Sequence, residues 1–78
     1  MPIVLRVGPY TFGFYASDRD EPPHVHVKSQ SKVAKYWLDP VRLDKGGKFR
    51  PHELTEIERI IVDHRTELLE AWHAFFRR

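Results

Sequence analysis

The sequence contains no cysteine among its 78 residues. This absence excludes disulfide bonds, a thiolate zinc site and a cysteine nucleophile, and it leaves His, Asp and Glu as the candidate metal ligands. The sequence also lacks any apolar run near the length of about 18 residues that a membrane-spanning helix needs. The first apolar run, Ile3 to Leu5, is too short for the core of a signal peptide. We therefore expect a cytoplasmic protein with no membrane partner.

The chain is too short for several domains or for a deep catalytic cleft. A domain of this size removes only about 60% of its unfolded surface from water. Its hydrophobic content of 41%, which includes two Trp, five Phe and three Tyr, is enough to fill one small core. We expect a single domain over residues 1–78.

The charges are distributed unevenly along the chain. Residues 1–50 contain nine Lys and Arg against five Asp and Glu, whereas residues 51–78 contain four against six. The basic first part is the candidate for contact with an anionic partner, although a modest excess of this kind is also typical of an ordinary solvated surface.

Alternating segments in the first half of the chain predict a sheet. The segments span residues 3–7, 11–16, 24–28 and 33–39. Pro40 is expected to end the fourth strand and to begin a loop over residues 40–50. From Pro51, apolar residues recur at helical spacing, which predicts one amphipathic helix over residues 51–77. The predicted fold is therefore α+β, a four-stranded antiparallel β-meander over residues 3–39 with one long C-terminal helix packed on one face.

The alternation also divides the strands into two faces. The apolar face, expected beneath the helix, consists of Ile3, Leu5, Val7, Phe12, Phe14, Ala16, Val25, Val27, Ala34, Tyr36 and Leu38. The opposite face consists of Arg6, Tyr15, His24, His26, Lys28, Lys35, Trp37 and Asp39. Because one helix covers only one face, we expect the second face to contact solvent or a partner.

Several segments together resemble a known family. They are Gly8-Pro9-Tyr10, Asp20 to Val27 with its Pro-Pro-His-Val-His-Val run, Ala34 to Val41, and His64-Arg65 with Leu68 to Trp72. This pattern covers nearly the whole chain and resembles the small bacterial proteins grouped as domain of unknown function 4160. The resemblance marks the positions of His24, His26 and His64. It implies a two-gene module of toxin-antitoxin or regulatory type, with the protein of the neighbouring gene as a partner, and it implies no catalytic residue.

His24 and His26 lie two residues apart on a strand, so both rings project from one face. Two such imidazoles can act as base and acid in the cleavage of RNA by its own 2′-hydroxyl. We predict them as the catalytic pair of a metal-independent ribonuclease that needs no cofactor. Cations on the same face would hold phosphates and aromatic rings would stack on bases. The predicted nucleic-acid-binding residues are Arg6, Tyr15, Lys28, Lys35 and Trp37.

Other interpretations of this face stay open. The two histidines could chelate a divalent metal with a carboxylate from the preceding loop, from Asp18, Asp20 or Glu21, but a His-X-His spacing alone is weak support and we predict no metal. The same rings and cations suit a non-enzymatic regulatory or protein-protein interaction module.

His64 lies on the apolar stripe of the helix and is expected to be a hydrogen-bonded core histidine. The alternative is a flipped third strand, which would bring His24 and His26 to His64 in a buried triad. That arrangement would expose Val25 and Val27, so it ranks second.

The predicted helix is longer than the predicted sheet. Residues 52–77 would span about 39 Å as one helix, whereas a strand of seven residues spans about 23 Å. The overhanging end would carry Trp72, Phe75 and Phe76, which we predict to form an interface with a second copy or with a partner protein. The alternative is that the loop with Val41, Leu43 and Phe49 folds back beneath this end.

Overall fold

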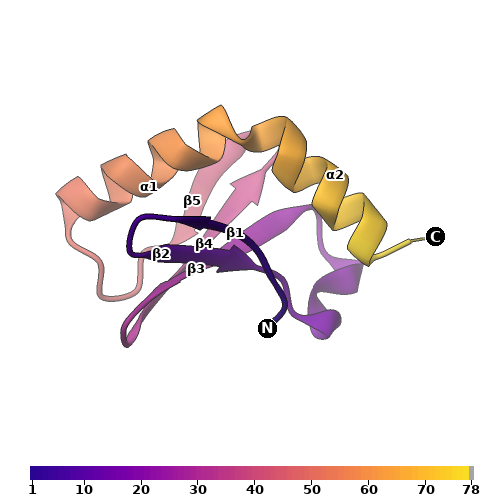
Figure 1. Cartoon of the computed structure of the whole chain (residues 1–78), viewed down its shortest axis with the longest axis horizontal. Helices are drawn as coiled ribbons and strands as arrows, with labels where there is room; N and C mark the ends of the chain where they lie inside the picture. The colour runs from indigo at the N-terminus through magenta and orange to yellow at the C-terminus, as the bar shows by residue number, and fades with distance from the viewer. Residues whose placement is uncertain (78) are drawn as a thin grey trace.

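The computed structural model describes residues 1–77 and shows an antiparallel sheet covered on one side by two helices (Figure 1). The elements in chain order are β1 (Ile3–Val7), β2 (Tyr10–Gly13), the 3-10 helix η1 (Ala16–Asp20), β3 (His24–Ser29), β4 (Lys32–Leu38), β5 (Val41–Lys45), α1 (Pro51–Asp63) and α2 (Arg65–Phe75). No helix in this part of the chain is long and apolar enough to cross a membrane.

The sheet is a meander of five strands in the order β1-β2-β3-β4-β5, with every neighbouring pair antiparallel. The α+β class and the antiparallel sheet are confirmed, but the expectation of four strands was wrong. Pro40 lies in the tight turn after β4 and does not end the sheet, because Leu38 pairs with Val41 across that turn. The first part of the predicted loop is therefore the edge strand β5.

The prediction of a single long helix was also wrong, because the helical region is divided into α1 and α2 at His64. His64 has φ −111° and ψ 19°, outside the helical range. Its backbone N–H and its ring Nδ1 both lie close to the carbonyl oxygen of Ile60, at 3.0 and 2.9 Å. The next residue, Arg65, donates to the Leu38 carbonyl (2.9 Å) and to Asp39 Oδ1 (2.6 Å), which ties the break to the end of β4.

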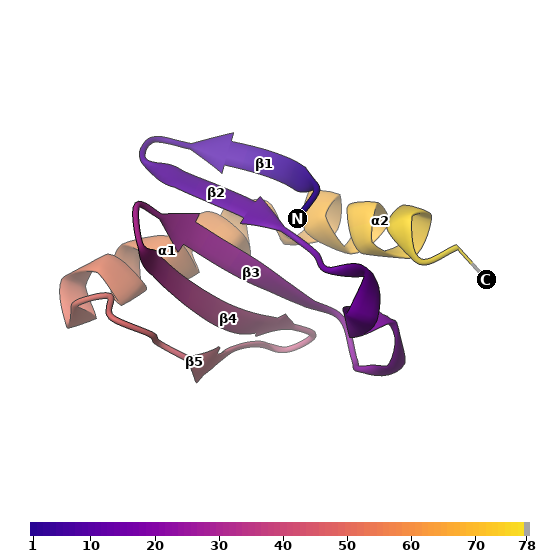
Figure 2. The ribbon, with the colours of Figure 1, turned by 90° about the horizontal axis from the view of Figure 1, so that it is seen from below.

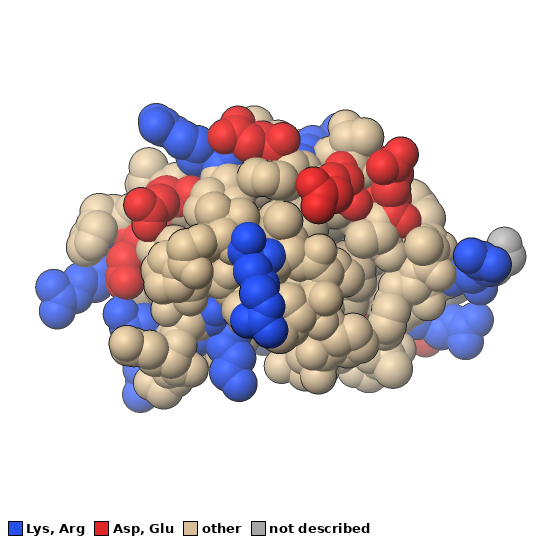
Figure 3. All heavy atoms as spheres, viewed as in Figure 1, with Lys and Arg blue, Asp and Glu red and all other residues tan. Residues whose placement is uncertain are grey.

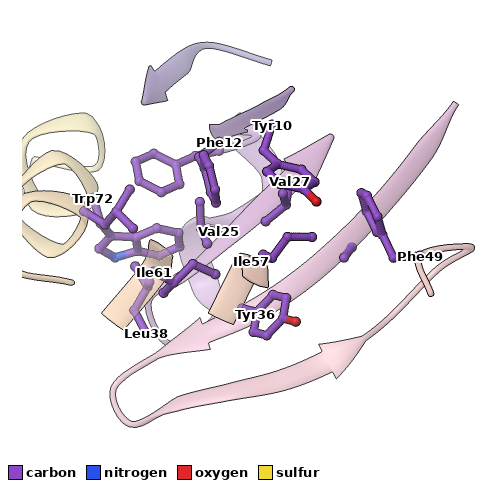
Figure 4. Packing of buried hydrophobic residues seen from close by; sticks show 13 residues of the cluster. Tyr10, Phe12, Val25, Val27, Tyr36, Leu38, Phe49, Ile57, Ile61 and Trp72 are labelled. Carbon is purple, nitrogen blue, oxygen red and sulfur yellow. The ribbon is translucent and has the colours of Figure 1, made fainter. Parts of the chain in front are cut away.

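The core lies between the sheet and the two helices (Figure 4). The strands contribute Phe12, Val25, Val27, Ala34, Tyr36 and Leu38, and Phe14 follows directly after β2; all seven were predicted on this face. The helices contribute Ile57, Ile61, Leu68 and Trp72. Tyr10 and Phe49 are buried as well. Ile3 and Ala16 are exposed instead, since Ile3 begins an irregular edge strand and Ala16 belongs to η1.

The C-terminal aromatic residues pack within the chain because the break turns α2 toward the end of the sheet (Figure 1). Trp72 is only 5% exposed and packs with its ring centroid 5.2 Å from that of Phe14. Trp72 is therefore buried within the chain, in contrast to the exposed overhang predicted for a straight helix, and an interface through these residues stays a prediction. The alternative, in which the segment with Val41, Leu43 and Phe49 folds beneath the C-terminal end of the helix, was wrong too. This segment packs near α1, at the other end of the helical region. Of the three predicted interface residues, Phe75 is the most exposed, at 38%, and the homodimer stays a prediction.

Loss of the Trp72 ring should destabilise the monomer. We expect Trp72→Ala to lower the free energy of unfolding by about 3–5 kcal/mol, because a large buried ring leaves a cavity. The matched change Phe75→Ala should cost less, about 1–2 kcal/mol, because this ring is 38% exposed and loses only its pairs with Phe14 and Phe76. Urea denaturation at two protein concentrations measures both. If Trp72→Ala left the free energy of unfolding unchanged and altered only the sedimentation of the protein, Trp72 would belong to an intermolecular interface.

Two buried tyrosines predict loss of stability in alkali. The hydrogen bond to Glu56 and burial raise the pKa of Tyr10 to about 12, and burial raises the pKa of Tyr36, whose hydroxyl donates to the Leu54 carbonyl, to about 12. The unfolded chain loses these protons from about pH 10, before the folded chain does. The free energy of unfolding should therefore fall as the pH rises from 10 to 12. Urea midpoints should fall less for Tyr36→Phe than for the parent or for the exposed control Tyr15→Phe, and equal declines in all three would contradict the prediction.

Candidate functional site

The candidate site lies on the face of the sheet that the helices leave open (Figure 2). Strand register puts side chains of neighbouring strands side by side on this face. His24 pairs with Trp37, which in turn pairs with Arg42, and His26 pairs with Lys35. In the next row the pairs are Arg6 with Thr11, Thr11 with Lys28, and Lys28 with Val33.

The 3-10 helix η1 covers one end of this face, beside β3. It begins after Tyr15, whose backbone N–H donates to Asp18 Oδ2 at 2.8 Å, while the Asp18 N–H donates back to the Tyr15 carbonyl at 3.0 Å. Short polar side chains favour such local turns because they bond to nearby backbone groups. This turn directs the Asp18 carboxylate onto the two histidines of β3.

Asp18 Oδ2 lies between the two imidazoles. It is 3.0 Å from His26 Nε2, which donates a hydrogen bond, and 3.2 Å from His24 Nε2. The side chains of His24, Asp18 and His26 are 0%, 9% and 14% exposed. Of the three carboxylates that the sequence offered, Asp18 lies against both rings, and Glu21 Oε1 lies 3.8 Å from His24 Nδ1.

His24 is enclosed by backbone and by aromatic rings. Its Nδ1 lies 3.0 Å from the Pro22 carbonyl oxygen. Its ring centroid is 5.5 Å from that of Trp37 and 5.0 Å from that of Trp72. The predicted outward direction of His24 is right, but η1 and α2 close over this end of the sheet, so the ring is not exposed as expected.

The electrostatics separate the protonation states of Asp18 and His26. Burial by itself would raise the pKa of Asp18, but the Tyr15 N–H and the two histidines outweigh it and hold that pKa below its ordinary value. Burial lowers the pKa of His26 by more than the Asp18 carboxylate raises it. At neutral pH Asp18 is therefore charged and His26 is neutral.

The predicted nucleic-acid-binding residues divide into two groups. Arg6 and Lys28 are exposed, and Tyr15 is exposed with its ring edge against His26 (4.6 Å between centroids). Lys35 is held by Glu21 at 2.6 Å and Asp44 at 3.6 Å, and its Nζ lies 4.6 Å from the Trp37 ring. Lys35 is thus a neutralised cation.

Arg42 is a cation of this face that the sequence prediction missed. It is exposed and pairs in register with the half-buried Trp37. The alternation of Val41, Arg42 and Leu43 indicates a strand, but Pro40 was predicted to begin a loop, so this strand was missed.

His64 does not join the other two histidines. It lies at the helix break, half-buried, with its ring bonded to the Ile60 carbonyl oxygen. Val25 and Val27 face the core, so β3 is not flipped and the alternative triad does not form.

The comparison with protein families confirms the resemblance of the sequence. The chain belongs to the family described as Domain of unknown function (DUF4160), whose model matches residues 10–73. The matched residues include η1 and β3, and with them Asp18, His24 and His26. No curated protein and no solved structure matches the chain.

Removal of the Asp18 carboxylate should destabilise the fold. Asp18→Ala leaves the Tyr15 N–H and the His26 ring without their buried acceptor, so we expect the free energy of unfolding to fall by about 2–3 kcal/mol. Asp63→Ala, which changes an exposed carboxylate on α1, should stay within about 0.5 kcal/mol of the parent. Urea denaturation compares the two, and an equally small effect at Asp18 would contradict its role as the acceptor that holds η1 on the sheet.

Proposed function

We propose that the chain binds single-stranded RNA on the open face of its sheet. The observation that carries the proposal is the set of exposed cations that shares with an aromatic ring the part of this face that η1 leaves open. Arg6 and Lys28 lie in one row across β1, β2 and β3, and Arg42 lies beside Trp37 on β5 and β4.

This chemistry suits a single strand of nucleic acid. Cationic side chains attract the phosphates, and an aromatic ring stacks on any base because every base presents a flat face. The Trp37 ring is half-buried, fixed by Lys35 and by the edge of His24, so little of its conformational freedom is lost on stacking. The proposed contact residues are Arg6, Tyr15, Lys28, Trp37 and Arg42.

The distribution of charge supports the same face. In Figure 3 most of the acidic side chains lie over the helical layer, where some basic side chains lie too, while the other basic side chains project from the sheet side and from the two ends. An RNA strand would be drawn to the sheet side and repelled by much of the helical side. Lys35 contributes little to this attraction, since Glu21 and Asp44 already neutralise it.

Cleavage of RNA by His24 and His26 is not part of the proposal. A general base must come within hydrogen-bond reach of the proton that it removes. His24 has no exposed surface, so the two rings cannot act together as base and acid in this arrangement. His26 keeps only Nδ1 for such a role, because its Nε2 donates to Asp18. The ribonuclease stays a prediction that would require this end of the sheet to open. The role of RNA binding in a two-gene, toxin-antitoxin-like module rests on the family resemblance alone.

Binding should depend on salt through specific cations. We expect fluorescence anisotropy of a labelled single-stranded RNA to show affinity that falls linearly with salt on logarithmic axes. Arg6→Ala with Lys28→Ala should reduce the slope by about 1.4, because each phosphate contact to a single strand contributes about 0.7. Trp37→Ala should weaken binding by about 1–3 kcal/mol by removal of a stacking surface.

The matched control is Arg59→Ala, which removes an exposed cation from α1 on the opposite side of the molecule. It should change the affinity and the slope little. Equal effects of Arg59 and of the Arg6 and Lys28 pair would indicate unspecific attraction. Absence of binding at low salt would reject the proposal and favour the alternative, a regulatory or protein-protein interaction module.

A further inference from the structure

Three candidate ligand atoms converge where η1 crosses β3. Asp18, His24 and His26 each offer one ligand atom, and these three atoms all lie within 4.8 Å of one another. The carboxylate oxygen is 3.2 Å from His24 Nε2 and 3.0 Å from His26 Nε2. Ligand atoms bound about 2.0 Å from a tetrahedral Zn²⁺ are about 3.3 Å apart. Two edges of the cluster therefore have nearly the dimensions of such a site.

His24 Nε2 is the buried atom of this cluster that lacks a hydrogen-bond partner. A carbonyl oxygen only accepts hydrogen bonds, so the contact with Pro22 assigns a proton to His24 Nδ1. In the neutral ring Nε2 then carries a lone pair. This nitrogen is fully buried and has no hydrogen-bond partner. Its neighbour at 3.2 Å, Asp18 Oδ2, is also an acceptor, so a positive centre is needed between the two.

A metal ion would supply that positive centre to both atoms at once. It would also coordinate the third ligand atom, His26 Nε2, which lies 3.0 Å from the same carboxylate oxygen.

We propose that Asp18, His24 and His26 bind one divalent transition-metal ion of the Zn²⁺ class. Two imidazoles and one carboxylate suit Zn²⁺, whereas Mg²⁺ and Ca²⁺ prefer oxygen ligands throughout. His26 would bind through Nε2 after its proton moves to Nδ1. Its side chain is the most exposed of the three, so solvent can supply a fourth ligand. Three protein ligands with a solvent position are typical of catalytic zinc sites rather than structural ones.

The groups around the ligands already hold them in position. The Pro22 carbonyl orients the His24 ring, and the Tyr15 N–H orients the Asp18 carboxylate. Outer partners of this kind fix the tautomer and direction of metal ligands in known sites. The inference does not depend on the proposed RNA binding.

Calorimetric titration of the metal-free full-length chain with Zn²⁺ tests the site. We expect one ion per chain, and a Co²⁺ complex with the intense visible absorption of tetrahedral coordination. His26→Gln should weaken Zn²⁺ binding by about 100-fold or more, since even loss of an outer partner costs about 10–100-fold. His52→Gln, an exposed histidine on α1, is the matched control and should bind like the parent. Equal binding by His26→Gln and the parent would overturn the proposal.

A second measurement uses the parent protein, so it does not depend on whether a variant folds. Nitrogen NMR of the histidine rings should show Zn²⁺ shifting Nε2 of His24 and His26 while the rings of His52, His64 and His73 stay unchanged. Absence of any shift up to millimolar Zn²⁺, or a His24 ring that stays doubly protonated at neutral pH with Zn²⁺ present, would overturn the proposal. In that case a proton or a buried water molecule, not a metal ion, would satisfy His24 Nε2.

Discussion

The alternation of side chains along β3 is the constraint on which both the core and the candidate site depend. Val25 and Val27 point into the core, and His24 and His26 point to the other face. A shift of one residue would put two imidazoles against the helices and expose two valines, each worth about 1.5–3 kcal/mol when buried. The same pairing with β2 and β4 therefore fixes the hydrophobic packing and the convergence of the histidines.

The second determinant is η1, which divides the open face into two environments. At one end it buries Asp18 against the histidines, and this end becomes a polar, largely enclosed cluster. The remainder keeps exposed cations and aromatic rings. Trp37 lies at the boundary, with its ring 5.5 Å from that of His24. The proposed RNA surface and the proposed metal site would therefore be neighbours, and a base stacked on Trp37 would lie beside the metal cluster.

The helix break completes the enclosed end. A straight helix would have carried Trp72 away from the sheet, whereas the turn at His64 brings it against Phe14 and His24. Arg65 stabilises the turn through contacts with Leu38 and Asp39, which are far away in the chain. The break thus serves the core and the site together.

The sequence by itself determined the fold class, the two faces of the first four strands, the helical region and the direction of the histidines. These properties follow from the period of apolar residues, which is local information. Tertiary structure alone decided that Pro40 lies in a turn within the sheet, that the helix breaks at a residue with no Pro or Gly nearby, and that Asp18 lies between the two histidines. Each depends on contacts between distant segments, such as Arg65 with the end of β4 and η1 with β3. The burial of His24 belongs to the same class, because it requires Trp72 from the far end of the chain.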